Sequence, residues 1–263
     1  MTVLDGIILG IIQGLTEFLP ISSSGHIELG SALLNVQTKN NFLFSLVVHG
    51  ATALSTMVVF RKDLLTLAQD GLKFQWNAST KYLVLLIISA VPVAIIGLMY
   101  DQEIEGFFSG ETLLVGFMLL VTGLLLSLTY YSPPKSGSVS WGRAVLIGLA
   151  QAISILPGIS RSGATISTAL LLGVEKEQAA RFSFLMVLIP ILGGTLLKLL
   201  EYLQNPGGYE QISIWVLVAG FIAAFLSGLL ACNWMISIVK KGKLIYFAIY
   251  CFVVGAIAIA VSL

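Results

Sequence analysis

Charged side chains are scarce in this sequence: lysine, arginine, aspartate and glutamate together make up 10% of its 263 residues. Hydrophobic residues make up 57%, and the mean hydropathy is +0.97. A water-soluble domain of this length cannot bury so much apolar surface, so the sequence predicts an integral membrane protein. Lysine and arginine form no basic block beyond short pairs in loops, and no nucleic-acid partner is expected.

Cysteine is almost absent, and so are the signals of secretion. Cys232 and Cys251 lie in or beside apolar runs with neither metal-ligand nor disulfide spacing, so we interpret both as small packing residues. The N-terminus lacks a basic segment and contains Asp5, so a cleaved signal peptide is not expected.

The apolar runs fall into two length classes. Six approach the roughly 20 residues that a helix needs to cross the hydrocarbon core; they are Asn41–Phe60, Tyr82–Tyr100, Thr112–Tyr131, Phe182–Leu200, Ile212–Ala231 and Leu244–Leu263. Four are too short to span, namely Gly6–Phe18, Gly25–Asn35, Arg143–Leu156 and Gly163–Gly173. These short runs flank Leu19-Pro20 and Pro157-Gly158, where proline and glycine stop a helix. Each pair therefore predicts a re-entrant hairpin, whose polar tip survives inside a membrane only against protein or a wet cavity.

The two predicted hairpins are copies of each other. Residues 10–26 resemble residues 148–164 without a gap, and the register continues to Phe44-Ser45 against Phe182-Ser183, 138 positions later. Three spans, an odd number, separate the hairpins, so we expect them to enter the membrane from opposite faces. The predicted fold is an all-α polytopic membrane protein with six transmembrane helices plus two re-entrant helical hairpins in an inverted-topology repeat. Residues 1–131 form the first repeat, 132–142 the linker and 143–263 the second repeat, all in one integral membrane domain.

Charge predicts the orientation. One set of loops is basic, with Arg61, Lys62, Lys73, Lys81, Lys135, Arg143, Lys176, Arg181, Lys240, Lys241 and Lys243. The opposite set is acidic, with Asp101, Glu103, Glu105, Glu111, Glu201 and Glu210, and only Lys39 and Lys198 nearby. By the positive-inside rule the basic set is cytoplasmic, so both termini are expected on the outer face.

Each predicted tip has a serine-rich segment before its second helix, at Ser22–Gly25 and Ser160–Gly163. Serine is a preferred N-cap, and helix N-termini attract phosphate and carboxylate groups. Simple capping is the alternative interpretation of these serines.

The copies differ in their charged and titratable residues. Glu17 and His26 occur only in the first copy and Arg161 only in the second, and Glu17 shares a helix face with Gln13. Arginine grips phosphate with two parallel donors, although Arg161 could equally form a structural pair with Glu17. A carboxylate, an imidazole, hydroxyls and a guanidinium around an anion site are the groups that phosphoryl transfer uses. His49 is instead interpreted as a packed, hydrogen-bonded residue.

The stretches Gln13–His26 and Pro157–Thr165 resemble the two signatures of the undecaprenyl-diphosphate phosphatase family, the bacitracin-resistance proteins of bacterial envelopes. The resemblance implies hydrolysis of undecaprenyl diphosphate to undecaprenyl phosphate and inorganic phosphate, which recycles the carrier lipid for peptidoglycan and other envelope polymers and confers bacitracin resistance. It also implies a multi-pass protein of the bacterial inner membrane whose site opens to the outer face. A divalent cation, magnesium or calcium, is the implied cofactor. The bilayer and a polyprenyl diphosphate lipid are the expected partners, and a homodimer is possible.

The resemblance assigns roles residue by residue. Arg161 would clamp the departing phosphoryl group, and Glu17 would hold the cation or orient the nucleophile. His26 would be the nucleophile, or the acid–base partner of a hydroxyl at Ser22 or Ser23; attack by water is the third possibility. Some family members have glutamate where this chain has Gln13, so Glu17 is the only predicted metal ligand. The predicted substrate-binding residues are Gln13, Ser24, Gly25, Ser160, Ser162, Gly163 and Thr165.

Two other functions compete with this interpretation. Inverted repeats with broken helices around a midplane anion site also build transporters, so a transporter or flippase of a polyprenyl phosphate is the main alternative. A second class of membrane lipid phosphatase also contains Ser-Gly-His, but it needs a Ser-Arg followed by histidine and aspartate. Neither follows Ser160-Arg161 at that spacing here.

Overall fold

The computed structural model describes residues 1–34, 42–73, 75–100, 112–132, 136–204 and 212–262, and the regular elements among them are α-helices. They are α1 (Val3–Phe18), α2 (Ser23–Leu33), α3 (Phe42–Val59), α4 (Arg61–Gly71), α5 (Ala78–Met99), α7 (Thr112–Tyr130), α8 (Trp141–Ile153), α9 (Arg161–Leu171), α10 (Lys176–Met186), α11 (Leu188–Gln204), α12 (Ile214–Lys241) and α13 (Ile245–Ser262). Among these described residues, five helical segments are long and apolar enough to cross a membrane, and there are six if the bent pair of α3 and α4 is one span. This confirms an all-α polytopic membrane protein.

The structure corrects one predicted loop and the bounds of two predicted spans. Helix α3 ends at Val59, one residue before the predicted end of the first span, but the segment after it, predicted as a loop, is the helix α4, which departs from α3 at 79°. The fourth span begins earlier than predicted, since α10 starts at Lys176 and continues into α11 after a break at Val187. The fifth extends past Ala231 to Lys241 and ends in a left-handed Gly242, a common C-cap.

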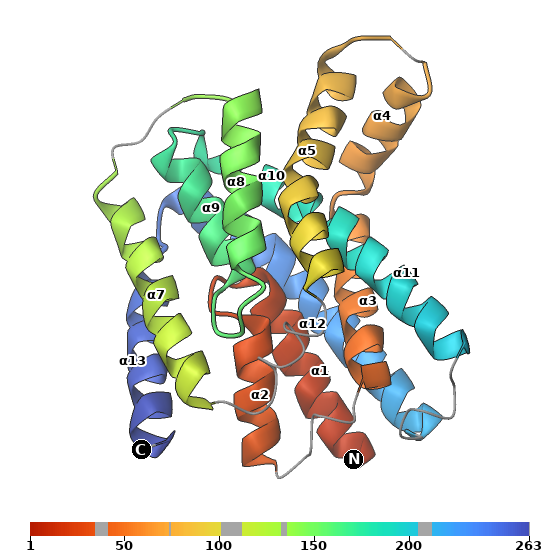
Figure 1. Ribbon diagram of the computed structural model, residues 1–263, viewed down its shortest axis with the longest axis vertical. Helices are drawn as coiled ribbons and strands as arrows, with labels where there is room; N and C mark the ends of the chain where they lie inside the picture. Colours follow the sequence, from red (N-terminus) through yellow and green to blue (C-terminus); the bar gives the residue numbers. More distant parts are fainter. Residues whose placement is uncertain (35–41, 74, 101–111, 133–135, 205–211, 263) are drawn as a thin grey trace.

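Both short hairpins form as predicted. At the start of α1, Thr2 and Asp5 cap each other's backbone N–H groups, and α1 ends where Leu19, in extended conformation before Pro20, leaves the helix. Figure 1 shows both chain termini at the lower end of the molecule. The α1–α2 hairpin rises from that end and α8–α9 descends from the opposite end, so the hairpins enter from opposite sides as expected.

Glycines related by the repeat let each hairpin pack against the other half. A Cβ added to Gly10 of α1 would lie 2.5 Å from the carbonyl oxygen of Gly220 in α12. Gly148 of α8 is the equivalent glycine, 138 positions later. A Cβ added there would lie 2.5 Å from the carbonyl oxygen of Ser89 in α5. Each half therefore supports the hairpin of the other, through its own second span.

The third spans, α7 and α13, pack together through another glycine pair. A Cβ on Gly116 would lie 3.0 Å from the carbonyl oxygen of Gly255, and one on Gly255 would lie 2.8 Å from that of Gly116. By contrast, a Cβ on Gly193 or Gly194 would meet nothing within 4 Å. A homodimer stays a prediction.

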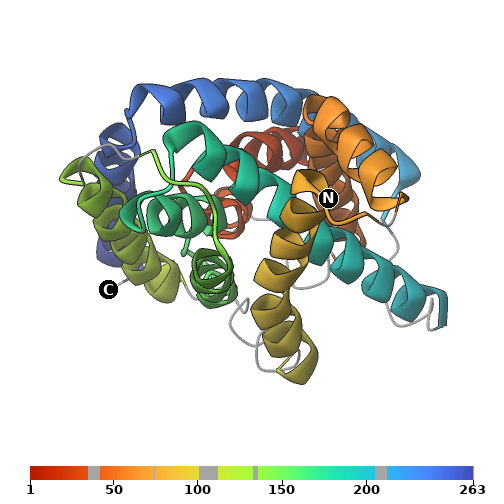
Figure 2. The same ribbon diagram turned by 90° about the horizontal axis from the view of Figure 1, so that it is seen from above.

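Apolar side chains form the core and also cover the outside of the molecule, and a set of polar side chains is buried among them. Viewed from above, the two hairpins occupy the centre, with α7 and α13 on one side, α12 along another, and α5 and α11 splayed away from it (Figure 2). Large exposed side chains such as Leu98, Leu196 and Leu230 cover the outer helix faces. The buried polar set is Gln13, Thr16, Glu17, Ser22, Glu28, Ser31, Thr52, Ser55, Thr56, Ser89, Thr122, Gln151, Ser154, Ser160, Ser162, Thr165, Ser167 and Ser183. This distribution suits a bilayer around a polar centre.

Parts of the predicted topology fall outside the described residues. The acidic positions 101–111 and 210 lie there, as do Lys39 and Lys135. The orientation of the protein and the division of the chain at 132–142 therefore stay predictions.

The glycine packing predicts opposite effects of one substitution at two helix positions. Gly10→Ala should lower the thermal unfolding temperature in detergent, because the added methyl group overlaps the Gly220 backbone and overpacking costs about 1–3 kcal/mol. Gly97→Ala is the matched control, since an added Cβ there meets nothing within 4 Å and alanine favours the helix. Equal unfolding temperatures for the two variants would contradict this account of the packing.

Candidate active site

The two hairpin tips meet through positions that the repeat makes equivalent. A Cβ added to Gly25 would lie 3.3 Å from Cα of Gly158, and one added to Gly163 would lie 3.4 Å from Cβ of Pro20. Residues 25 and 163 correspond in the repeat, as do residues 20 and 158. Because these glycines have no side chains, the two helix breaks can touch each other.

A serine caps the second helix of each hairpin. Ser22 Oγ accepts a hydrogen bond from Gly25 N at 3.3 Å, and Ser160 Oγ accepts one from Gly163 N at 3.1 Å. The capping interpretation of these two serines is therefore confirmed. At the start of α9 the N–H groups of Arg161 and Ser162 have no intrahelical acceptor, which leaves them directed beyond the helix end.

Two hydrogen bonds join the tips to each other. Gly158 N donates to Ser22 Oγ at 3.2 Å, and Ser162 Oγ donates to the Leu19 carbonyl at 3.1 Å. Ser22 also has a φ of 71°, in the left-handed region that non-glycine residues adopt at a cost of about 1–3 kcal/mol. The bond from the second hairpin thus holds a strained turn of the first.

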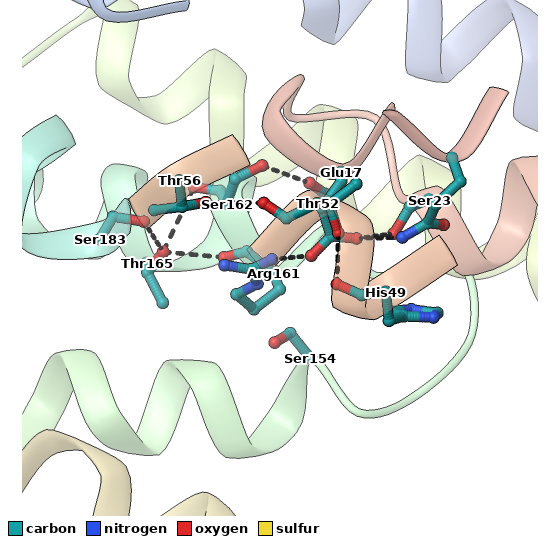
Figure 3. A network of polar contacts seen from close by, with 12 residues as sticks. Glu17, Ser23, His49, Thr52, Thr56, Ser154, Arg161, Ser162, Thr165 and Ser183 are labelled. Carbon is teal, nitrogen blue, oxygen red and sulfur yellow. Dashed lines mark hydrogen bonds and ion pairs between the residues drawn. The ribbon is translucent and has the colours of Figure 1, made fainter. Parts of the chain in front are cut away.

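Glu17 is the centre of the polar network between the tips (Figure 3). Its Oε2 accepts hydrogen bonds from Ser23 Oγ at 2.7 Å and from Gln13 Nε2 at 3.0 Å. Its Oε1 pairs with Nη2 of Arg161 from the second hairpin. One carboxylate therefore contacts residues of both repeats, which brings together Gln13, Glu17, Ser23 and Arg161 as predicted.

Burial makes the Glu17–Arg161 pair obligatory. The Glu17 side chain is 6% exposed and that of Arg161 is 16% exposed. An ionised group at this depth costs several kcal/mol unless an opposite charge compensates it. Each charge is therefore tolerated because the other half of the chain supplies its partner.

Thr122 and Ser183, which the sequence interpretation did not single out, support the second tip together with the predicted residue Thr165. Thr122 of α7 donates to the Gly158 carbonyl at 3.1 Å and accepts from Ser160 N at 3.0 Å, so it fixes the backbone on both sides of Ile159. Thr165 is 2.5 Å from Ser183 of α10, Oγ to Oγ, and donates to the Arg161 carbonyl at 2.8 Å. The Thr122 contacts join α7 to a tip that is 36 to 38 residues later in the chain, so no local sequence pattern predicts them.

His26 lies at the tip but its ring contacts other groups than Glu17 and Arg161. Its Nδ1 is 2.8 Å from the Ser22 carbonyl oxygen, and its Nε2 is 2.8 Å from the hydroxyl of Tyr250 in α13. Neither contact is to a serine hydroxyl. Ser24, another predicted residue, lies 3.3 Å from Ser22, Oγ to Oγ.

His49 of α3 is held by hydrogen bonds, as its interpretation as a packed residue implied. Its backbone carbonyl oxygen accepts from Thr52 Oγ1 at 2.9 Å (Figure 3). Its Nδ1 is 2.8 Å from the Ser45 carbonyl oxygen, so it is hydrogen-bonded as expected.

The donor groups at the site would suit a cation only if the substrate completed its coordination. Among the residues that the structure describes, no three histidine, cysteine, aspartate or glutamate side chains gather into a metal cluster. The carboxylate of Glu17 and the buried Oε1 of Gln13, for which no hydrogen-bond donor is found, are the available oxygen ligands. Magnesium often binds through one or two carboxylates together with substrate phosphates, and this pair fits that mode.

Comparison with known proteins gives one consistent result. The sequence profile of the family described as "Bacitracin resistance protein BacA" matches residues 6–257. An undecaprenyl-diphosphatase of Christiangramia forsetii is 54% identical over 261 residues, covering 98% of this chain and 98% of the relative. The corresponding protein of Bacteroides fragilis is 49% identical, covering 98% and 97%. Undecaprenyl-diphosphatase 2 of Bacillus thuringiensis is 37% identical over the same shares.

The buried ion pair predicts a rescue in a double variant. Arg161→Met should lower the unfolding free energy by about 3–5 kcal/mol, because it leaves Glu17 buried without its counter-charge. Adding Glu17→Gln should recover part of that loss, since the second change removes the uncompensated charge. Detergent unfolding curves of the unchanged protein and the two variants measure both effects.

The pair of Arg181 with Asp63 serves as the control. Their side chains are 46% and 29% exposed, so Arg181→Met should cost only about 1 kcal/mol or less. A double variant at positions 17 and 161 that is no more stable than Arg161→Met alone would show that the pair does not balance charge.

Proposed function

The chain belongs to the bacitracin resistance protein BacA family and is an undecaprenyl-diphosphatase, and we propose that it hydrolyses its substrate between the two hairpin tips. One observation supports this location above all. The hydroxyl of Ser23 and the guanidinium of Arg161 bind the two oxygens of a single carboxylate, that of Glu17. A nucleophile, a base and an anion-binding cation thus lie within one hydrogen-bond network.

Arg161 would change partners when the substrate binds. In the structure its guanidinium neutralises Glu17, while the N-terminus of α9 that it begins directs N–H groups past the helix end. A terminal phosphate placed there would receive two parallel donors from Arg161 together with these N–H groups. The ion pair is then a resting state that keeps the empty site neutral.

Ser23 is our candidate nucleophile and Glu17 its base. Ser23 Oγ already donates to Glu17 Oε2 at 2.7 Å, which is the geometry that proton transfer requires. Attack of this oxygen on the terminal phosphorus breaks the bond to the bridging oxygen, and undecaprenyl phosphate leaves. The serine proton passes to Glu17. Water then hydrolyses the phosphoserine, which releases inorganic phosphate and restores the hydroxyl.

A divalent cation would be held by the Glu17 carboxylate and the side-chain oxygen Oε1 of Gln13, together with the substrate phosphates. Magnesium suits this site because it prefers oxygen ligands. When bound, it neutralises charge on the diphosphate. Calcium remains the other candidate.

We further propose that the site opens to the outer face of the bacterial inner membrane, the face of both termini. Hydrolysis there would return the carrier lipid to the monophosphate form for peptidoglycan and other envelope polymers, which would confer bacitracin resistance. The exposed apolar side chains of the outer helices give the prenyl tail a surface of matching polarity.

Arg161 variants test the location of the reaction. Arg161→Ala should lower phosphate release from undecaprenyl or farnesyl diphosphate by about 100- to 1,000-fold, because a transition-state donor is lost. Arg161→Lys should restore little, since lysine lacks the paired donors. Arg181→Lys, at the exposed ion pair, should keep the rate of the unchanged protein.

Lipid movement in liposomes separates the transporter alternative from this proposal. Purified protein with magnesium that releases no phosphate yet moves polyprenyl phosphate across the bilayer would replace the enzyme assignment with a transporter. Activity of Arg161→Ala within a few-fold of the unchanged protein would instead remove this arginine from the mechanism.

Ser23→Ala tests the nucleophile. It should reduce phosphate release by about 100-fold or more and abolish labelling of the protein after acid quench with substrate carrying a labelled terminal phosphate. Ser31→Ala is the matched control, because Ser31 is a serine of the same helix α2 whose buried hydroxyl has no hydrogen-bond partner. A label found on His26, or no label with full activity in Ser23→Ala, would assign attack to the imidazole or to water.

A further inference from the structure

The two ring nitrogens of His26 have different partners, and these define its protonation. Nδ1 is 2.8 Å from the Ser22 carbonyl oxygen, which can only accept a hydrogen bond. Nδ1 therefore carries the proton. In a neutral imidazole the other nitrogen, Nε2, then has a lone pair and accepts.

The acceptor nitrogen of His26 is satisfied by a tyrosine of the last helix. The Tyr250 hydroxyl is 2.8 Å from Nε2, so its O–H donates to the ring. The two rings also stack, with centroids 5.6 Å apart and an interplanar angle of 17°. Tyr250 thus fixes both the tautomer and the plane of the imidazole.

The imidazole in turn holds the strained turn that precedes the candidate nucleophile. The Ser22 carbonyl accepts from Nδ1 and also from the His26 backbone N–H at 3.2 Å. Ser22 is the residue with the positive φ of 71°, and Ser23 follows it directly with its hydroxyl on Glu17. The orientation of the Ser22 peptide therefore governs where Ser23 points.

We propose that Tyr250 is a positioning residue for the hydrolysis: its hydroxyl holds His26 in the Nδ1–H tautomer, and that N–H holds the Ser22 carbonyl so that Ser23 faces Glu17. The effect on turnover rests on the proposed function, whereas the effect on the tautomer does not. His26 is in this arrangement a support of the Ser22 turn, with neither nitrogen free to attack phosphorus.

The chain is well suited to a direct test because it contains two histidines. In protein labelled with ¹⁵N-histidine at pH 8, above the ordinary imidazole pKa of about 6.5, both rings should show a protonated Nδ1 and an unprotonated Nε2. His49 is the internal reference, since its Nδ1 also faces a carbonyl, that of Ser45, at 2.8 Å. His49→Gln identifies which signals belong to His26.

Tyr250→Phe removes the hydroxyl and keeps the ring. The His26 signals should shift toward a mixture of tautomers while those of His49 stay unchanged. The kcat for undecaprenyl diphosphate should fall about fivefold with an unchanged KM, as expected for one hydrogen bond of ordinary strength. Tyr246→Phe, one turn earlier in α13 and 64% exposed, is the matched control and should alter neither measurement.

Each other outcome overturns the proposal. Unchanged His26 signals in Tyr250→Phe would show that the hydroxyl does not set the tautomer, whatever happens to the rate. Shifted signals with an unchanged kcat would show that the tautomer does not govern the position of Ser23. Failure of the protein without substitutions to release phosphate would refute the proposed function and leave the tautomer result to stand alone.

Discussion

The structure depends on one ion pair, between Glu17 and Arg161, inside a molecule whose outer faces are apolar. Neither charge is tolerable alone at that depth, and each comes from a different repeat. Their attraction therefore requires the two helix breaks to meet, and it gives the empty centre a neutral state. The same two residues are the ones that a diphosphate would separate, because its phosphate groups compete with the carboxylate for the guanidinium. Stability and chemistry thus rest on the same contact.

Duplication supplied the scaffold around this pair. Gly10 and Gly148 bring the first helix of each hairpin against the opposite half, while Gly25 and Gly163 let the tips approach each other. These close contacts require glycine, so glycine occupies the equivalent positions of both copies. Glu17 and Arg161, the charged residues that differ between the two copies, lie at positions that do not take part in these glycine contacts. A symmetric framework therefore presents an asymmetric site.

Local patterns in the sequence predicted the features that local physics determines. Apolar run lengths gave the spans and hairpins, and serine before a helix gave the caps at Ser22 and Ser160. Contacts between distant helices left no such pattern, so Thr122 and Tyr250 were missed. The charges of α4 are typical of a loop between spans, whereas the helical spacing of Leu64, Leu67 and Ala68 indicates the helix that forms.

The separation of 144 residues between Glu17 and Arg161 has a consequence for biogenesis. Ribosomal synthesis runs from the N-terminus, so the acidic hairpin reaches the bilayer long before its basic counterpart exists. During that interval Gln13 and Ser23, both from the same hairpin, are the groups at hand to solvate the carboxylate. Tyr250 arrives later still. A nascent chain released before its final helix would thus contain the Glu17–Arg161 pair but lack the contact of Tyr250 with His26.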